Sequence, residues 1–185
     1  MQSIISYLSD IDNIYGVFLD ANRGFDLIKD DCEKINRGVS DEMLKKRKNL
    51  YGVGDPNSTE SYPLHVVNQY DYLQRNLKNG KNRFMLANQS VVQIYQYWED
   101  MYREEIARNM GICKNDLKVD VFGDLRIIRQ SIIHNHGIAT SDITKCKILK
   151  WFNQKQVIEI DSKMFEKIVF ESKGSLKKLA GLGSV

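Results

Sequence analysis

Basic and imidazole side chains recur at close spacing in the segment DLRIIRQSIIHNHGIAT, residues 124–140. Arg126, Arg129 and His134 interrupt a stretch whose other residues have the apolar spacing of a buried helix. A guanidinium carries a fixed positive charge, and an imidazole exchanges protons near neutral pH. These side chains could therefore supply acid–base chemistry beside a charge-stabilising group, which a core helix does not require.

Helical projection separates this segment into an apolar face and a polar strip. At about 100° per residue, one narrow arc holds the side chains that we expect in the core, which are Val121, Leu125, Ile128 and Ile132. Arg126, Gln130 and His134 form the polar strip. Arg129 lies at the edge of the apolar arc, about 140° from His134. Ile127 projects beside the strip, so we expect it to be exposed in one chain and to pack against a partner.

The elements that would position these side chains are predicted to be helices. Apolar spacing predicts helices over residues 4–20 and 25–37, which we expect to form an antiparallel pair, and a third helix over residues 63–77 with Pro63 in its first turn. Residues 40–62 predict a surface loop, because glycine, proline, asparagine and serine are frequent there. The longest pattern, Phe84 to Ala107, predicts the central helix of the fold.

The chain after the central helix predicts two further helices. The segment with the candidate side chains predicts a helix over residues 121–135, closed by Gly137 in a left-handed conformation. The sequences KILKWF and VIEI flank NQKQ, which predicts a small β-hairpin or an extended packing segment. A last short helix is expected over SKMFEKIVF with Ser162 as its N-cap, and residues 173–185 are expected to form a flexible tail.

These patterns together predict an all-α fold. The expected architecture is an up-and-down bundle of roughly four to six helices with a short β-hairpin near the C-terminus. Residues 1–172 are expected to form one domain, since their number is a common domain size.

The composition favours an ordinary globular protein, with 42% hydrophobic and 28% charged residues. The chain has no apolar run of about 18 residues that could span a bilayer, and its N-terminus lacks the basic segment of a signal peptide. Its three cysteines are far apart and fit reduced thiols, so we expect a cytoplasmic location. The net charge of +3 does not identify a nucleic-acid-binding protein, and the basic runs LKKRKNLYG and RNLKNGKNRF are interpreted as solvated loops.

Arg129 and His134, in the sequence RQSIIH, resemble the Arg-x4-6-His motif of the HEPN (higher eukaryotes and prokaryotes nucleotide-binding) superfamily of helical proteins. The longer stretch DLRIIRQSIIHNHGIA resembles the motif helix of that family, and YQYWEDMYREEIA is similar to the central helix of one bacterial branch. The resemblance covers about Asn88 to Asp161. It implies a helical bundle, and many members of the family are metal-independent ribonucleases that act as dimers with their motif helices facing a shared cleft.

The resemblance implies an endoribonuclease that acts as a toxin or defence effector and cleaves RNA by attack of the 2′-hydroxyl, leaving a cyclic phosphate and a 5′-hydroxyl. Arg129 would stabilise the phosphorane, and His134 would serve as acid, base or phosphate ligand. The auxiliary candidates for RNA binding or positioning are Gln130, Arg126, Asn135, His136, Asp124, Glu99 and Arg103. We expect RNA, a second copy of the chain and an antitoxin protein as partners, and neither a metal, a cofactor nor a membrane.

A symmetric dimer is expected because Arg129 and His134 point in different directions on one helix. Two facing helices would bring both side-chain types to one phosphate, with Ile127 in the interface beside both copies of His134. The arginines of both copies would converge on one groove, so RNA binding should weaken as salt rises.

Each candidate also has a structural alternative. Arg129 could form a surface salt bridge with Glu99 or Asp124, and the two histidines of the sequence HNH could cap the helix C-terminus. Glu99 and Arg103, four residues apart, could form a helix-stabilising ion pair or orient the motif helix. The chain as a whole could be a catalytically inactive bundle that binds RNA or a partner protein through the polar strip.

The chain departs from the family pattern at two positions. Gln130 follows the motif arginine, where the family often has Asn or another polar residue, and its side chain reaches further than that of Asn. In the branch neutralised by a nucleotidyltransferase antitoxin, the modified group is the tyrosine of a His-x-Tyr motif, and this chain has His136 at that place. The resemblance therefore does not extend to that form of regulation.

Overall fold

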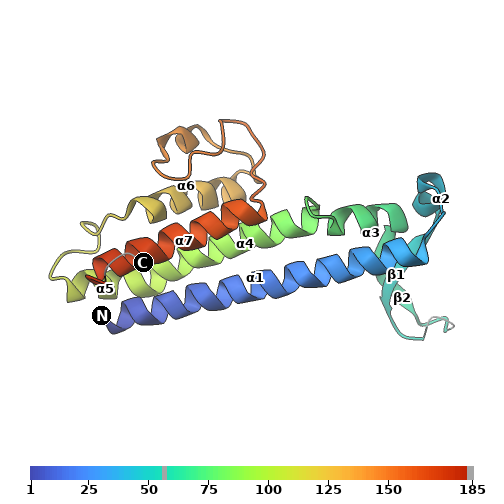
Figure 1. Cartoon of the computed structure of the whole chain (residues 1–185), viewed down its shortest axis with the longest axis horizontal. Helices are drawn as coiled ribbons and strands as arrows, with labels where there is room; N and C mark the ends of the chain where they lie inside the picture. Colours follow the sequence, from blue (N-terminus) through green and yellow to red (C-terminus); the bar gives the residue numbers. More distant parts are fainter. Residues whose placement is uncertain (56–57, 183–185) are drawn as a thin grey trace. The chain divides into compact units, whose positions relative to one another are not determined.

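The computed structural model of the chain describes residues 1–55 and 58–182 (Figure 1). The chain divides into two compact units, of which the first comprises Met1–Asp20 and Phe84–Val185 and the second Ala21–Arg83. The sequence predicts one domain over residues 1–172, whereas the structure gives residues 21–83 a compact unit of their own. Residues 56–57 of the predicted loop and 183–185 of the predicted tail lie outside the described residues.

The first unit contains all of the candidate residues and is helical. Its elements are the N-terminal part of α1 (Gln2–Ile35), α4 (Lys81–Tyr97), the π-helical segment η1 (Trp98–Tyr102), α5 (Arg103–Asn109), α6 (Asp120–His134), the 3₁₀ segment η2 (Ser141–Lys145) and α7 (Ser162–Leu179). The helices predicted over residues 84–107 and 121–135 correspond to α4–η1–α5 and to α6. The prediction of a mostly helical fold with one short hairpin is confirmed.

Aromatic rings join these helices in the core of the first unit. Tyr7 of α1 is fully buried, and its hydroxyl donates a hydrogen bond to the Ile94 carbonyl of α4 at 2.8 Å. Trp98 of η1 and Phe122 of α6 stack with 4.2 Å between ring centroids. Phe165 of α7 lies 6.1 Å from the ring of Tyr15, again between centroids. The core therefore holds α6 against the region where α4 passes into η1.

The π-helical turn was not predicted from the sequence. At its end the Arg103 N–H bonds to the Trp98 carbonyl, five residues back. A π turn contains more residues than an α turn, so it changes which side chains face a neighbouring helix, and such turns are frequent at functional sites. Here it adjoins the surface of α6 that carries the motif residues.

The predicted antiparallel pair of helices over residues 4–20 and 25–37 is wrong, because α1 is one continuous helix from Gln2 to Ile35. The sequence ANRG between the two patterns contains no proline, and a glycine within a helix costs only about 1 kcal/mol relative to alanine. The position of a Cβ atom at Gly24 is open, so the neighbouring structure does not require a break there.

The second unit contains the rest of α1, α2 (Asp41–Lys46), α3 (Gln69–Asn76) and a two-stranded antiparallel sheet of β1 (Lys48–Val53) and β2 (Tyr62–Asn68). Leu50 pairs with Val66 across the sheet. The prediction of a loop over residues 40–62 and of a helix from Pro63 is therefore wrong. Aromatic and β-branched residues in YPLHVVN favour a strand, and α3 begins after Asn68, whose side chain accepts the Asp71 N–H at 2.7 Å.

The C-terminal part of the first unit also differs from the prediction in detail. The sheet lies in the second unit, and the predicted hairpin segment contributes only an isolated bridge between Ile138 and Val157 among the described residues. Asp161, not Ser162, caps α7, because its side chain accepts the Met164 N–H at 2.8 Å. Residues 173–179 are helical rather than a flexible tail, since Leu176 continues the apolar spacing and is fully buried.

Within the described residues, no helix combines the length and the apolar character needed to cross a membrane.

Candidate functional site

The polar strip of α6 and the π-helical turn together line a cavity of about 420 Å³. The lining residues come from two stretches of the first unit, and they are Tyr95, Gln96, Glu99 and Asp100 on one side and Arg126, Arg129, Gln130 and His134 on the other. Five of the nine residues predicted as site residues thus share one cavity, which are Arg129, His134, Gln130, Arg126 and Glu99.

Arg129 and His134 lie in contact within a single chain, with 3.5 Å between Arg129 Nη1 and His134 Nε2. The expectation that the two side chains point in different directions on the helix is therefore wrong. Helical projection treats side chains as short radial spokes, whereas an arginine is long and side chains of a helix lean toward its N-terminus. His134, in the last turn, leans back toward Arg129, and the guanidinium covers the remaining distance.

The guanidinium of Arg129 has no carboxylate partner among the described residues. The Nε atom is buried and makes no hydrogen bond there. The two carboxylates expected as partners are used elsewhere: Glu99 pairs with Arg103 and Lys114, and Asp124 accepts backbone N–H groups. The alternative of a surface salt bridge for Arg129 therefore has no counterpart in the described structure.

Glu99 is the centre of an ion-pair network that holds the π-helical turn. One carboxylate oxygen lies 2.9 Å from Arg103 Nη1, and the other lies 3.0 Å from Lys114 Nζ. Burial by itself would raise the pKa of Glu99, but the hydrogen bonds from Lys114 and Arg103 hold it below its usual value. Arg103 also donates to the Leu117 carbonyl at 3.2 and 3.3 Å, three residues before α6 begins. The predicted ion pair is present, and it links η1 to the start of the motif helix.

Asp124 is a buried anchor rather than a cavity residue of the Arg129–His134 site. Its side chain is 2% exposed and accepts backbone N–H bonds from Lys147, Ile148 and Leu149 at 2.8, 2.7 and 2.8 Å. These bonds hold residues 147–149, which follow η2, against the first half of α6. Asp124 therefore acts on the site only by holding its surroundings.

The end of α6 places Asn135 and His136 outside the cavity. Asn135 is the C-cap, and its side-chain amide donates to the Ile138 carbonyl at 2.6 Å. His136 and Gly137 both have left-handed backbones, with φ of 53° and 76°, and the Gly137 N–H bonds to the Ser131 carbonyl at 3.1 Å. The predicted left-handed termination is present, but it begins one residue earlier than Gly137.

Ile127 is 8% exposed and belongs to the core, so its prediction as an exposed interface residue is wrong. Residues 147–149, after α6, bond to Asp124 one turn before Ile127, and Lys145 and Lys147 line the same cavity as Ile127. The projection of an isolated helix does not include these later residues. Ile133 is 44% exposed instead. It follows Arg126 by seven residues, almost two full turns, and therefore lies on the same face of α6 as the strip.

Four cavity or network residues were not singled out as site residues by the sequence analysis: Tyr95, Gln96, Asp100 and Lys114. Burial raises the pKa of Tyr95, as does the charge of Glu99, so its hydroxyl stays protonated and donates to Glu99 at 3.5 Å. The side chains of Gln96 and Asp100 are in contact with each other. The segment YQYWEDMYR contained a signal for these residues, because positions 95, 96, 99 and 100 fall within an arc of about 140° on an α-helix with about 100° per residue, and they line one cavity in the structure.

In the part of the chain that the structure describes, no group of three or more histidine, cysteine, aspartate and glutamate side chains is arranged to hold a metal ion. His65, the third histidine, lies in the second unit, 2.9 Å from Arg75 Nη1. Comparison of the chain with protein-family models, with curated proteins and with solved structures finds no match.

Proposed function

We propose that the chain is a metal-independent endoribonuclease whose site is formed by Arg129 and His134. The observation that carries the proposal is the state of Arg129, which touches His134, has a buried unpaired Nε and forms no ion pair among the described residues. A partly buried cation without a counter-ion favours an anionic ligand, because leaving such a charge unpaired is costly. The resemblance of RQSIIH to the HEPN motif supports an RNA phosphodiester as that anion.

The reaction would be a transphosphorylation within RNA. The 2′-oxygen forms a bond to the neighbouring phosphorus, the bond from phosphorus to the 5′-oxygen breaks, and the products are a cyclic phosphate and a 5′-hydroxyl. The 2′-hydroxyl loses a proton, and the leaving oxygen gains one. His134 would transfer one of these protons, and Arg129 would bind the non-bridging oxygens and stabilise the phosphorane. Arg126 and Gln130, on the same cavity, would hold the adjoining backbone.

The test is single-turnover cleavage of a labelled RNA in the presence of EDTA. The wild-type chain should cleave, and Arg129→Ala and His134→Ala should each slow cleavage by at least about 100-fold. Arg108→Ala is a matched control, because Arg108 is an exposed arginine of α5 that does not line the cavity. Absence of cleavage by the wild type, or equal cleavage by the two site variants, would remove the catalytic proposal.

We also propose that the active form is a homodimer. His134 is the one histidine that lines the cavity in the described chain, whereas the reaction moves two protons, so a facing second copy could supply the second imidazole. The exposed Ile133 beside the strip is the apolar residue that such a contact would cover. Light scattering at about tens of micromolar should show a dimer for the wild type and a monomer for Ile133→Glu. A monomeric wild type that still cleaves would exclude the shared site.

A second candidate is a catalytically inactive bundle that binds RNA or a partner protein through the strip. The observation in its favour is that the groups of the cavity that could exchange a proton already have partners. The imidazole of His134 contacts Arg129, and both carboxylate oxygens of Glu99 form ion pairs. Growth arrest on expression, relieved by His134→Ala, would support an RNA-cleaving toxin or defence effector, for which an antitoxin protein would be a natural partner. RNA binding that persists without His134, with no cleavage, would support the inactive bundle.

A further inference from the structure

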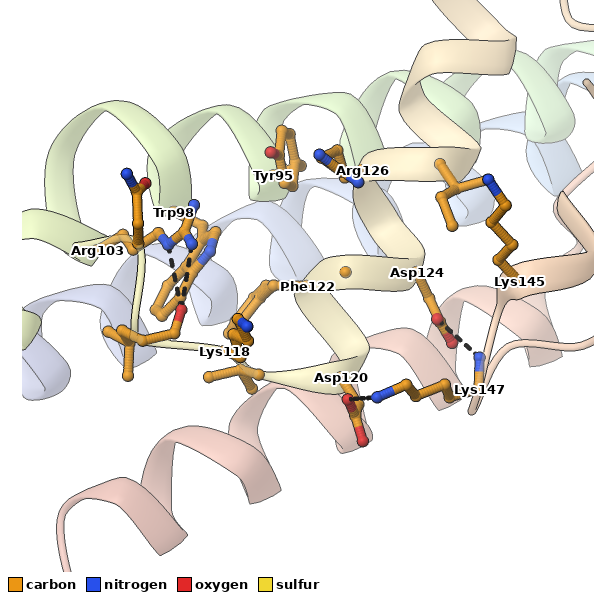
Figure 2. Close-up of a pocket in the computed structure, with 15 residues that line it drawn as sticks. Tyr95, Trp98, Arg103, Lys118, Asp120, Phe122, Asp124, Arg126, Lys145 and Lys147 are labelled. Carbon is orange, nitrogen blue, oxygen red and sulfur yellow. Dashed lines mark hydrogen bonds and ion pairs between the residues drawn. The ribbon is translucent and has the colours of Figure 1, made fainter. Parts of the chain in front are cut away.

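A second cavity adjoins the Arg129–His134 cavity, and Tyr95 and Arg126 line both of them (Figure 2). Its volume is about 390 Å³. Pockets that hold small organic ligands have volumes of about 300–1,000 Å³, so a ligand of nucleoside size fits. The walls come from the stretch where α4 passes through η1 into α5, from the segment before α6 and the first half of α6, and from the end of η2 with Lys147 just after it.

Cationic side chains exceed carboxylates in the lining by five to two, with Arg103, Lys118, Arg126, Lys145 and Lys147 against Asp120 and Asp124. Asp124 accepts three backbone N–H bonds and Asp120 pairs with Lys147 at 2.7 Å. Two more of the cations are paired with carboxylates outside the lining, Arg103 with Glu99 and Lys145 with Asp142. Lys118 and Arg126 have no ion-pair partner in the part of the chain that the structure describes. The cavity therefore favours an anionic ligand, and Arg126 stands at its boundary with the proposed catalytic site.

The inner wall of the cavity is aromatic and carries an unused donor. Trp98 is 2% exposed and forms a cluster with Phe122 and Tyr7, whose ring centroids lie 4.2 Å and 6.1 Å from that of the indole. Trp98 and Phe122 both line the cavity. The indole Nε1–H has no hydrogen-bond partner among the described residues. Trp98 Nε1 is not among the fully buried unpaired atoms of the described residues, so this donor is free to bond to solvent or to an acceptor of a ligand.

We infer that this cavity binds the base and ribose of the nucleotide next to the phosphate held by Arg129 and His134, an inference that rests on the proposed function. Arg126 would bind the phosphate that connects the two cavities, and the Trp98 N–H would donate to an acceptor of the base or ribose. A nucleotide unites the two required properties, a flat ring system for the apolar wall and a phosphate for the cationic rim.

Gly123 offers a way to close the cavity without disturbing the fold. It lies in α6, three residues before Arg126, lines the cavity, and has no atom within 4 Å of the position that a Cβ would occupy. A larger residue there gains helix propensity, about 1 kcal/mol for replacing glycine, and its side chain would extend into the cavity. Gly174 of α7 is a matched control, since its Cβ position is equally open and it lines neither cavity.

The test is calorimetric titration with nucleoside 5′-monophosphates, which contain no phosphodiester and cannot be cleaved. The wild-type chain should bind at least one of them more tightly than it binds inorganic phosphate. Gly123→Leu should weaken that binding by at least about tenfold, which corresponds to about 1.4 kcal/mol. Gly174→Leu should bind like wild type, and neither variant should melt below the wild-type temperature. Equal binding by Gly123→Leu and wild type, or equal affinity for phosphate and nucleotide, would overturn the inference.

RNA cleavage separates this inference from the proposed function. If the wild type cleaves RNA and Gly123→Leu cleaves it with unchanged KM and kcat, the ribonuclease proposal stands and the nucleotide cavity is excluded. If monophosphates bind in a manner that depends on Gly123 and no RNA is cleaved, the cavity stands and the catalytic proposal is excluded.

Discussion

Substitution of Asp124 tests whether this residue stabilises the fold around the motif helix through its hydrogen bonds. Its carboxylate, 2% exposed, accepts the backbone N–H groups of Lys147, Ile148 and Leu149 at 2.7–2.8 Å. One oxygen takes the Lys147 N–H, and the other takes the remaining two. Replacement by asparagine keeps the shape but turns one acceptor into a donor that faces N–H groups.

The expected loss follows from these bonds. A hydrogen bond to a charged group contributes about 1.5–3 kcal/mol, and a buried donor left unpaired costs about 1–3 kcal/mol. The Leu149 N–H is buried, whereas the other two donors are partly buried and can bond to water. We therefore expect Asp124→Asn to lower the free energy of unfolding by about 2–4 kcal/mol, measured by urea denaturation at neutral pH.

Asp120→Ala is the matched control, because Asp120 lies one turn earlier on α6 and also bonds to Lys147, but through the side chain and at an exposed position. Its ion pair should contribute less than about 0.5 kcal/mol. An Asp124→Asn variant whose unfolding free energy equals that of Asp120→Ala would show that the three backbone bonds do not hold this region, and the role of Asp124 as an anchor would have to be abandoned.

Three further predictions concern burial, backbone strain and pH. Ile127→Ala should lower the unfolding free energy by about 2–4 kcal/mol because Ile127 is buried. Ile133→Ala, at an exposed position, should change it by less than about 0.5 kcal/mol. Equal losses of unfolding free energy for the two variants in urea titrations would contradict the burial of Ile127. His136→Gly should raise the melting temperature, since the left-handed backbone at φ 53° strains any residue with a Cβ. The gain in unfolding free energy should not exceed about 1 kcal/mol. A lower melting temperature would argue against that strain. The pKa of Glu99 is lowered, so its ionised form stabilises the fold at pH values above the ordinary pKa of 4.5, and this stabilisation is lost as the pH falls below 4.5 through the folded-state pKa. Glu99→Gln should flatten this part of the curve of unfolding free energy against pH. An unchanged curve would show that the ion pairs of Glu99 do not stabilise the fold.

The sequence was most informative where local rules decide the structure. The apolar arc of Leu125 and Ile128 predicted the buried face of α6, and both residues are fully buried. The left-handed end of the helix was predicted to within one residue, because glycine tolerates that backbone and marks it. The buried face and the end of α6 could be predicted in this way since spacing and termination are properties of adjacent residues.

The sequence failed where distant parts of the chain decide the outcome. Ile127 was expected to be exposed because the projection of an isolated helix does not include the residues after α6. Asp124 was expected at the site, but its partners are backbone groups 23–25 residues away. No sequence motif indicates such partners. The strands of the second unit were missed because the turn residues between them favoured a loop over the whole stretch, although the aromatic and β-branched residues of β2 favour a strand.

The distribution of carboxylates explains why positive charge remains available along α6. The acidic residues nearest the motif form no ion pair with its arginines: Glu99 pairs with Arg103 and Lys114, Asp124 accepts backbone N–H groups, and Asp100 contacts the side chain of Gln96. Arg126 and Arg129, three residues apart, are thereby left side by side without an ion-pair partner among the described residues, although like charges at this spacing disfavour a helix by about 0.2–0.5 kcal/mol. A chain under selection for stability alone would pair these arginines with nearby carboxylates. Because those carboxylates bind other groups, Arg126 and Arg129 remain unpaired along one surface of the helix. A bound phosphate backbone would neutralise both charges.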